Sequence, residues 1–432
     1  MIKARDGRIL FLIKALVAMI FIAKISLGSF LPVPRNFSFI LFQAGLHPVV
    51  NVFLCVLFGV PLLLLFLKVR DRYSLSPFYK LFLFLLTLTL SVQTVLQTHF
   101  VNTQESTILQ LGAAGMAIFM IMVYGVAIPS LWSPEDFVRF VQRWSGTLVL
   151  ISLALLLVAP GAVFKGGRFI GIFKHIPHMV TCATIAFVFS LGTFLVETKS
   201  KHKIWNALII FTSFVAVVLT GTRSSAAAAL LAFVVTMIMH KTQSNQGRIF
   251  KFAFISLFVT FTLFFGPTVY EFAQGIATGQ NSLGNREAQD GVASRWEEVE
   301  RGSEIFMEEP WLGHGLLSKF AAGNDVDVSN YNAMKDPHNI FISAGVIGGW
   351  PFLALSGFAL LIMTIGALKT LMVSDISKRQ IAIYLLAHIP ILVIYHVHLS
   401  IGGMADRMYW MVFGFVAAST LRSIQNQTLT KN

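Results

Sequence analysis

Charged side chains are scarce in this chain of 432 residues: they make up 12% of it, whereas hydrophobic residues make up 56%. A soluble domain carries about twice that share of charge to cover its surface. The chain has 40 Phe residues but only 20 Asp and Glu residues. This composition excludes an ordinary soluble globular protein and predicts a surface that faces mainly lipid.

Carboxylates are also missing from the middle of the apolar stretches, because the acidic residues fall in loops or near the ends of these stretches. Transporters coupled to protons or sodium usually keep a carboxylate near the middle of the membrane. Its absence argues against an ion-coupled carrier. The sequence also has no Gly-rich phosphate loop, which argues against nucleotide-driven chemistry.

Metal ligands and disulfides have little support. The only two cysteines lie in separate apolar stretches, so no disulfide framework is expected. The close histidine pairs are His175-x-x-His178 and His396-x-His398, and neither has an acidic residue nearby in sequence. We therefore expect no metal site and no cofactor.

Long apolar runs dominate what is present. A helix that crosses the hydrocarbon core needs about 20 mostly apolar residues. Such runs predict an all-α polytopic membrane protein with about twelve spans, near residues 9–31, 48–67, 77–97, 107–131, 145–164, 175–196, 204–220, 224–240, 249–272, 339–368, 380–400 and 407–423. The predicted organisation is therefore about nine spans in residues 1–272, one large loop in residues 273–337, and about three spans in residues 338–432.

The distribution of Lys and Arg sets the orientation, because short cytoplasmic loops carry the excess of positive charge. With the N-terminus inside, most of the short-loop Lys and Arg residues fall on the inner side. We therefore expect both termini to be cytoplasmic and the large loop to lie outside. The formal net charge of +13 follows from this topology and from an anionic inner leaflet, so it does not indicate nucleic-acid binding.

Arg223 lies in a tight outer turn between two predicted spans, Thr220-Gly221-Thr222-Arg223-Ser224. Thr222 or Ser224 can cap the helix that follows. An arginine beside a helix N-terminus suits an oxyanion such as a phosphate. The alternative is an anchor to lipid headgroups, and the turn alone does not decide between the two.

The outer loop contains a predicted amphipathic helix from Val292 to Glu309. At 100° per residue, Val299 and Phe306 share a face with Arg295, whereas most of the glutamates fall on the opposite face. A cation on an apolar face is costly to bury without a partner. Arg295 is therefore predicted to meet an anion, with a structural ion pair as the alternative.

The segment Asp336-Pro337-His338-Asn339 leads into an apolar span. Asp at the N-cap and Pro at the first helical position form a strong helix start signal. His338 would then lie in the first turn, where the positive helix end disfavours imidazolium and keeps a neutral base. The alternative is a polar residue at the membrane interface.

Arg168 and Lys174 form a further outer cluster together with His175 and His178. The positive-inside rule does not account for these outer charges. The cluster either guides an anionic headgroup or belongs to an interfacial belt.

In this order and topology, the segments resemble the O-antigen ligase and O-antigen polymerase superfamily of bacterial inner membranes. Gly167-Arg168-Phe169 is similar to an upstream motif of that family. The specific part covers about residues 165 to 360. The other matching segments are Gly221-Thr222-Arg223-Ser224, Arg295-Trp296, Pro310-Trp311-Leu312-Gly313-His314-Gly315, Pro337-His338-Asn339 and a span with Gly345, Gly348 and Gly349.

The resemblance implies an enzyme that moves a glycan from undecaprenyl diphosphate to an acceptor at the periplasmic face, without metal or nucleotide. Arg223 and Arg295 would hold the diphosphate and stabilise the charge that develops on it. His338 would act as general base on the acceptor hydroxyl, with inversion at the anomeric carbon. Arg168, Lys174 and Asn339 would be further substrate contacts.

A ligase and a polymerase could both use these residues. A ligase passes the finished O-antigen to the lipid A core, whereas a polymerase extends the glycan on its carrier. The chain ends about ten residues past its last predicted span, so we do not expect the C-terminal periplasmic domain of related protein-glycosylating enzymes. Compactness and the clear histidine motif favour the ligase, by family analogy.

A lipid or polysaccharide carrier without an active site is the alternative from a different functional class. It would use the outer cations as a funnel for headgroups. The roles of His314, Tyr331 and Asp406 stay open at this point.

Overall fold

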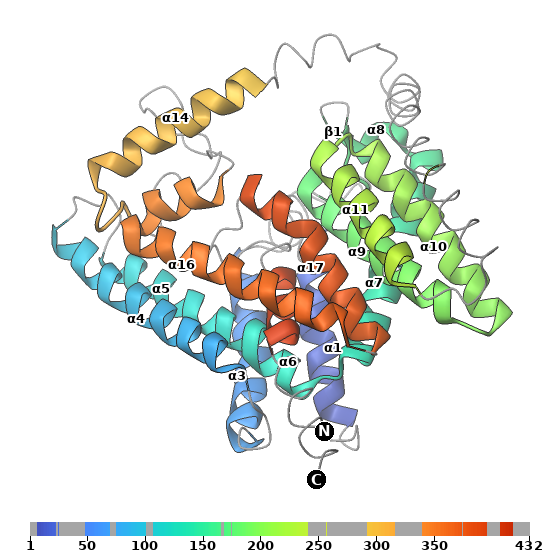
Figure 1. The fold of residues 1–432 in the computed structure, drawn as a ribbon, viewed down its shortest axis with the longest axis horizontal. Helices are drawn as coiled ribbons and strands as arrows, with labels where there is room; N and C mark the ends of the chain where they lie inside the picture. The colour runs from blue at the N-terminus through green and yellow to red at the C-terminus, as the bar shows by residue number, and fades with distance from the viewer. Residues whose placement is uncertain are drawn as a thin grey trace, which may run out of the picture. The chain divides into compact units, whose positions relative to one another are not determined.

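The structure of the protein, a computed structural model, describes residues 7–22, 25, 48–69, 75–100, 107–165, 168–173, 175–240, 256, 292–315, 339–373, 375–394 and 407–417. Over these residues the regular structure is helical apart from one pair of two-residue strands and an isolated bridge between Ile25 and Phe173 (Figure 1). The all-α prediction is confirmed.

The helices described in the first part of the chain come before Ser133. They are α1 (Gly7–Ile22), α3 (Pro48–Val69), α4 (Pro77–Phe100), α5 (Thr107–Met120), the π-helix η2 (Ile121–Ala127) and α6 (Ile128–Leu131). The elements that follow are α7 (Pro134–Val158), α8 (Pro160–Val163), β1 (Phe164–Lys165), β2 (Arg168–Phe169), α9 (Ile176–Val196), α10 (Ser200–Leu219) and α11 (Arg223–Met239). The last ones are α14 (Val292–Glu308), α16 (Ile340–Leu371), α17 (Ile376–Ile394) and a helical segment over 407–417.

Within the described residues, six helices are long and apolar enough to cross a membrane. They are Pro77–Phe100, Gln110–Leu131, Pro134–Val158, Ile176–Val196, Ser200–Leu219 and Ile340–Leu371. Shorter apolar helices occupy Ile9–Ile22, Phe53–Lys68 and Ser225–Met239. The protein is therefore a helical membrane protein. The count of about twelve spans stays a prediction, because the expected span at 249–272 falls almost wholly outside the described residues.

One helix begins well before its predicted span, which was placed at 145–164. This helix is α7, which begins at Pro134. Ser133 caps it, because the Ser133 hydroxyl oxygen accepts a hydrogen bond from the Asp136 backbone N–H at 3.1 Å. Proline at the first position and carboxylates in the first turn favour this start. Arg139, which falls between the predicted spans 107–131 and 145–164, lies on α7 and pairs with Glu135 at 2.5 Å.

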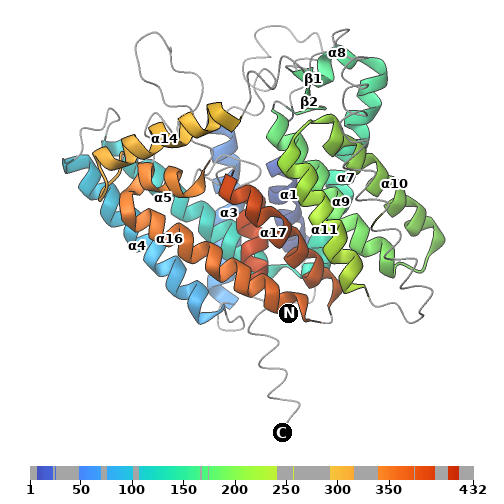
Figure 2. The same ribbon diagram turned by 45° about the horizontal axis from the view of Figure 1, so that its top comes forward.

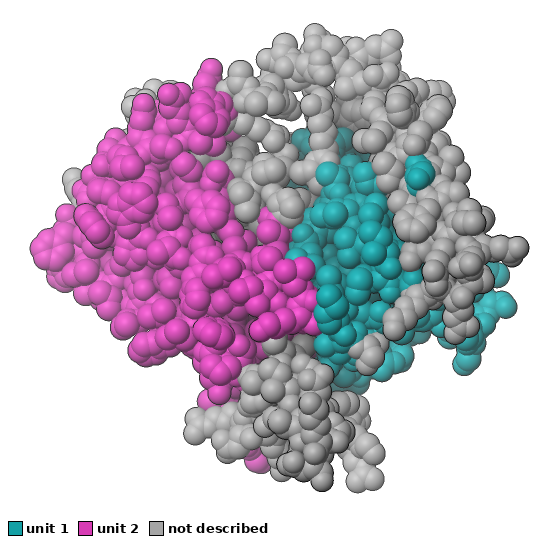
Figure 3. Space-filling view, in the orientation of Figure 1, with its two compact units in different colours: residues 1–62, 131–284, 371–388 teal, residues 63–130, 285–370, 389–432 magenta. Residues whose placement is uncertain are grey.

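Packing divides the chain into two units (Figure 3). Unit 1 comprises residues 1–62, 131–284 and 371–388, and unit 2 comprises residues 63–130, 285–370 and 389–432. In unit 1, helix α9 is the core: it is buried from Met179 to Gly192 and packs against α7, α10 and α11. The predicted division at residues 272 and 337 follows membrane topology and stays a prediction.

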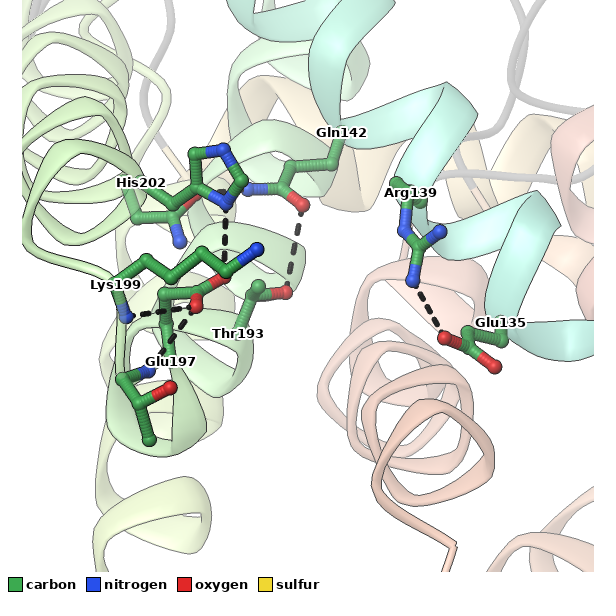
Figure 4. A network of polar contacts seen from close by, with 9 residues as sticks. Glu135, Arg139, Gln142, Thr193, Glu197, Lys199 and His202 are labelled. Atoms are coloured by element: carbon green, nitrogen blue, oxygen red, sulfur yellow. Dashed lines mark hydrogen bonds and ion pairs between the residues drawn. The ribbon is translucent and has the colours of Figure 1, made fainter.

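Polar side chains tie three helices of unit 1 together (Figure 4). The Gln142 amide of α7 donates to the Asn206 side-chain oxygen of α10 at 2.5 Å, and the Thr193 hydroxyl of α9 donates to Gln142 at 3.4 Å. Buried amides need such partners. At the turn between α9 and α10, the Lys199 backbone N–H donates to the Glu197 carboxylate, which lowers the pKa of that carboxyl.

The π-helix η2 lies in unit 2, within the predicted span at 107–131. A π-helix displaces backbone groups from their usual partners. The hydroxyl of Tyr79, buried at the start of α4, donates to the Gly125 carbonyl at 2.9 Å. Gly414 also approaches closely, because a Cβ atom at that position would lie 2.1 Å from the same carbonyl oxygen. The π-helix η2 is thus contacted at Gly125 by the Tyr79 hydroxyl of α4 and by the backbone at Gly414.

Removal of the Tyr79 hydroxyl tests this contact. We expect Tyr79→Phe to lower the free energy of unfolding by about 1–3 kcal/mol, because a buried carbonyl loses its donor. Tyr384→Phe is the matched control, since the Tyr384 hydroxyl has no hydrogen bond among the described residues. It should change stability by less than about 0.5 kcal/mol. Denaturant unfolding in detergent measures both, and equal losses would contradict a role for the Tyr79 hydrogen bond.

Candidate functional site

In unit 1, Arg168 braces the turn that precedes Arg223. The antiparallel pairing of β1 with β2 sets Arg168 opposite Lys165. The Arg168 Nε group donates to the Thr220 carbonyl at 3.0 Å, and its Nη2 group donates to the Thr222 hydroxyl at 2.9 Å. A planar guanidinium suits such a two-point contact. Arg168 and Arg223, which are distant in the sequence, are therefore connected through one turn.

The turn itself differs from the prediction in its cap. Thr222 occupies the N-cap position of α11, but its side chain makes no cap hydrogen bond, since its hydroxyl accepts from Arg168 instead. Gly221 has a φ of 61°, a conformation that favours glycine. Arg223 is the first residue of α11. The predicted position of this arginine at a helix N-terminus is confirmed, whereas its side chain falls outside the description.

In unit 2, the predicted loop helix is confirmed as α14, which ends at Glu308. The glutamates at 297, 300 and 304 are exposed, whereas Gly302 and Phe306 are buried. The apolar face therefore packs against the protein. By helical spacing, position 295 belongs to that face, although the Arg295 side chain falls outside the description.

Phe306 anchors α14 on the first half of α16, and both views show the two helices near each other (Figure 1 and Figure 2). Its ring packs edge-on against Trp350, with centroids 4.9 Å apart. A Cβ atom at Gly345 would lie 2.9 Å from the same ring. Glycine at this position therefore makes room for the aromatic residue of the loop helix.

Helix α16 is interrupted in its middle. Gly348 has φ −142° and ψ 23°, and Gly349 has φ 63° and ψ −161°, so neither is helical. Pro351 follows and has no N–H to offer the Ile347 carbonyl. A break in a membrane helix is tolerated where other protein groups satisfy the freed backbone.

The segment Pro310–Gly315 satisfies that backbone. The His314 N–H donates to the Val346 carbonyl at 2.7 Å, and the Gly315 N–H donates to the Ile347 carbonyl at 3.0 Å. In return, the Trp350 N–H donates to the Pro310 carbonyl at 2.8 Å. The motif that supported the family resemblance is thus the complement of the helix break. We call this arrangement the junction.

Glycines allow the two backbones of the junction to touch. A Cβ atom on Gly313 would lie 2.5 Å from the Gly348 nitrogen, and one on Gly349 would lie 2.5 Å from the Trp311 carbonyl carbon. Both glycines also have positive φ, at 67° and 63°. Sequence and geometry agree here, since only glycine meets both requirements.

Sequence reasoning missed Gln93 and Gln97 of α4, which complete the junction. The Gln93 amide donates to the Trp311 carbonyl at 3.2 Å and to the Gly348 carbonyl at 2.6 Å. The Gln97 amide donates to the Ile347 carbonyl at 2.9 Å and also to the Leu312 carbonyl. Two amides four residues apart in a predicted membrane span were the available signal.

His314, whose role the sequence left open, connects the junction to α14. Its Nε2 group donates to the Ile305 carbonyl at 2.8 Å. Because a carbonyl only accepts, Nε2 carries the proton. This histidine holds the loop against the end of α14, which is a structural role.

Asn339 caps α16. Its Oδ1 atom accepts from the backbone N–H groups of Phe341 and Ile342 at 3.0 Å and 3.3 Å. The cap predicted at Asp336 is therefore wrong for the described helix, which begins at Ile340. Asparagine is as good a cap as aspartate, and it lies nearer the apolar run. The Asn339 amide nitrogen makes no hydrogen bond among the described residues.

Several predicted positions fall outside the described residues: Lys174, Tyr331, His338 and Asp406. In sequence, His338 immediately precedes the Asn339 cap. The role predicted for His338 stays a prediction.

Alanine substitutions test the close approach in the junction. We expect Gly313→Ala and Gly349→Ala each to destabilise the protein by at least about 2 kcal/mol, because a Cβ meets backbone atoms and φ is positive. Gly357→Ala in the same α16 is the control, since nothing lies within 4 Å of its Cβ position. It should be neutral or stabilise by up to about 1 kcal/mol. Unfolding in detergent measures all three, and similar values for all would refute the packing argument.

Comparison with known proteins adds a family to this geometry. No curated protein matches the chain. Residues 208–361 match the family model described as O-antigen ligase. The matched range contains Arg223, α14 with Arg295, the Pro310–Gly315 segment, His338 and most of α16. The resemblance seen in the sequence to the O-antigen ligase superfamily is confirmed over this range of the chain.

Proposed function

We propose that this protein is an O-antigen ligase of the bacterial inner membrane. It transfers O-antigen polysaccharide from undecaprenyl diphosphate to the lipid A core at the periplasmic face, as a step of lipopolysaccharide biosynthesis. The observation that carries the proposal is the family match, which contains Arg223, Arg295 and His338 in one stretch. The many apolar helices agree with an enzyme whose donor and acceptor are both lipid-anchored.

In the proposed reaction, a hydroxyl oxygen of the lipid A core attacks the anomeric carbon of the glycan. The bond from that carbon to the diphosphate oxygen breaks, and undecaprenyl diphosphate leaves with the bonding electrons. Attack from the opposite face inverts the anomeric centre. His338 takes the hydroxyl proton as general base and later releases it to water.

Negative charge increases on the leaving diphosphate as its bond to the anomeric carbon breaks, so positive groups nearby stabilise the transition state. Arg223 and Arg295 supply this positive charge as guanidinium groups, which stay charged and pair with two oxygens at once. The N-terminal position of Arg223 on α11 adds the positive end of a helix. In this proposal the charge is stabilised by protein groups without a metal ion or nucleotide.

The surrounding contacts support this assignment. Arg168 is engaged with the turn before Arg223, so it positions that arginine and is not proposed to bind substrate directly. The Asn339 amide nitrogen can donate to a substrate oxygen while its side-chain oxygen caps α16. Lys174 is proposed as a further contact to the anionic donor.

The base and the arginines are tested by substitution in proteoliposomes with a lipid-linked glycan donor and a lipid A core acceptor. We expect His338→Ala to lower the transfer rate about 10²–10⁴-fold with little effect on donor binding. Arg223→Gln and Arg295→Gln should lower the transfer rate and also weaken binding of the donor. His202→Ala, an exposed histidine near the start of α10, is the control.

A carrier without an active site would tolerate His338→Ala far better than the arginine changes, so that pattern would contradict an enzyme. The assay contains no nucleotide and is run with and without a chelator. Loss of transfer when the chelator is present would contradict the metal-independent mechanism.

Cells without the protein separate ligase from polymerase. For a ligase, polymerised O-antigen accumulates on the lipid carrier and the lipid A core stays bare. For a polymerase, the core instead carries a single repeat unit. Gel analysis of lipopolysaccharide and carrier-linked glycan distinguishes the two activities. If the cells show neither of these patterns, both activities are ruled out.

A further inference from the structure

We propose that Gln93 and Gln97 of α4 are positioning residues for the transfer reaction, acting as a clamp on the junction. The inference rests on the proposed function for its catalytic consequence. Both glutamines lie outside the family match at 208–361, yet they contact its loop motif and its broken helix. We do not propose that they contact the substrate, Arg295 or His338. They act by fixing the Pro310–Gly315 segment, which follows α14, and the broken helix α16, which follows His338 in the sequence.

The clamp uses every donor that the two amides possess. An amide nitrogen has two protons, and each glutamine directs one to the loop and one to the helix. Gln93 joins Trp311 to Gly348. Gln97 joins Leu312 to Ile347. Each side chain thus connects the Pro310–Gly315 segment to α16 independently of the backbone hydrogen bonds between them.

The position of the glutamines on α4 matches the break in its partner. The buried side of α4 begins with apolar and aromatic residues, namely Tyr79, Phe82, Leu83, Leu86 and Leu90. The same side then changes to Gln93, Thr94 and Gln97. Amides therefore appear on this helix where it faces carbonyls of the interrupted part of α16 and of the Pro310–Gly315 segment. A purely apolar helix would leave the Gly348 carbonyl without the Gln93 donor.

A small rotation at the junction would displace the far end of α14, where residue 295 lies. Residue 295 lies thirteen positions before the end of α14, which corresponds to about 20 Å at 1.5 Å per residue. A tilt of about 10° at the junction would move that residue by about 3 Å. Catalytic groups need placement within about 0.5 Å. Small losses of rigidity at the clamp therefore become large displacements of the proposed diphosphate site.

Gln110 of α5 provides an internal comparison. It is 1% exposed and lies against the same junction, since a Cβ atom at Gly315 would be 3.1 Å from its side-chain oxygen. Neither atom of its amide group has a hydrogen-bond partner among the described residues. A buried glutamine at this place is thus not sufficient: of the three glutamines described at the junction, Gln93 and Gln97 connect loop to helix and Gln110 does not.

The first experiment measures transfer kinetics of Gln93→Leu and Gln97→Leu. Loss of positioning should lower kcat about 10- to 100-fold while the KM for the lipid-linked donor changes little. Gln110→Leu should keep the wild-type kcat. Gln380→Leu controls for lost stability, because its amide also donates to a helix carbonyl, that of Phe189 at 3.0 Å, within unit 1. An unchanged kcat in the α4 variants, or an equal fall in Gln380→Leu, overturns the proposal.

The second experiment uses Gln97→Glu, which keeps the size of the side chain. Its protonated carboxyl donates one hydrogen bond, whereas the ionised form donates none and repels the two carbonyl oxygens. We expect kcat of this variant to fall with rising pH more steeply than that of the wild type. A profile parallel to the wild type overturns the clamp, and this readout does not depend on the stability of the leucine variants.

The third experiment needs no activity and so separates the clamp from the proposed function. Spin labels are placed at Glu304→Cys on α14 and Val92→Cys on α4, both exposed, in a background with Cys55→Ala and Cys182→Ala. Their distance distribution should broaden in Gln93→Leu and Gln97→Leu but not in Gln110→Leu. An unchanged distribution overturns the clamp. Wild-type protein without transfer activity would instead refute the proposed function and leave the clamp to be judged on these distances.

Discussion

A backbone carbonyl within a membrane protein cannot be left without a donor, and the structure of unit 2 depends on this constraint. Helix α16 gives up its regular hydrogen bonds at Gly348 and Gly349. The missing partners come from the backbone of Pro310–Gly315 and from two side-chain amides of α4. Three separate chain segments are thereby joined at one place. Gly313 and Gly349 allow the backbones of the Pro310–Gly315 segment and α16 to touch.

This arrangement brings together the segments that carried the family resemblance. The loop helix, the Trp-Leu-Gly-His-Gly segment and the glycine-rich span form one interlocking structure around Phe306 and the broken α16. In unit 1, Arg168 plays a comparable part for the turn before Arg223. In both units, residues that seemed to be candidate ligands hold backbone in place, and the proposed reacting groups lie on the segments so held.

The sequence predicted those features that depend on local pattern. Hydropathy located α4 and α9, and helical spacing located α14 with its buried Phe306 and exposed glutamates. The early start of α7 was missed because hydropathy windows ignored the Ser133 cap. The cap of α16 was assigned to Asp336, although Asn339 lay closer to the apolar run. Gln93 and Gln97 could not have been assigned, since their partners are carbonyls whose availability arises only from tertiary structure. Arg223, Arg295 and His338 stood out by their places in the sequence, whereas their roles in glycan transfer came from the family resemblance.

The clamp also has a consequence for biogenesis. Gln93 and its acceptors are separated by 218 and 255 residues. At a synthesis rate of about 5–20 residues per second, α4 enters the membrane roughly 10–50 s before the acceptors exist. During that interval two amides lack their final partners in a medium that penalises them. A nascent chain interrupted before residue 348 would keep this polar patch exposed to lipid, a feature that distinguishes an unfinished protein from a mature one.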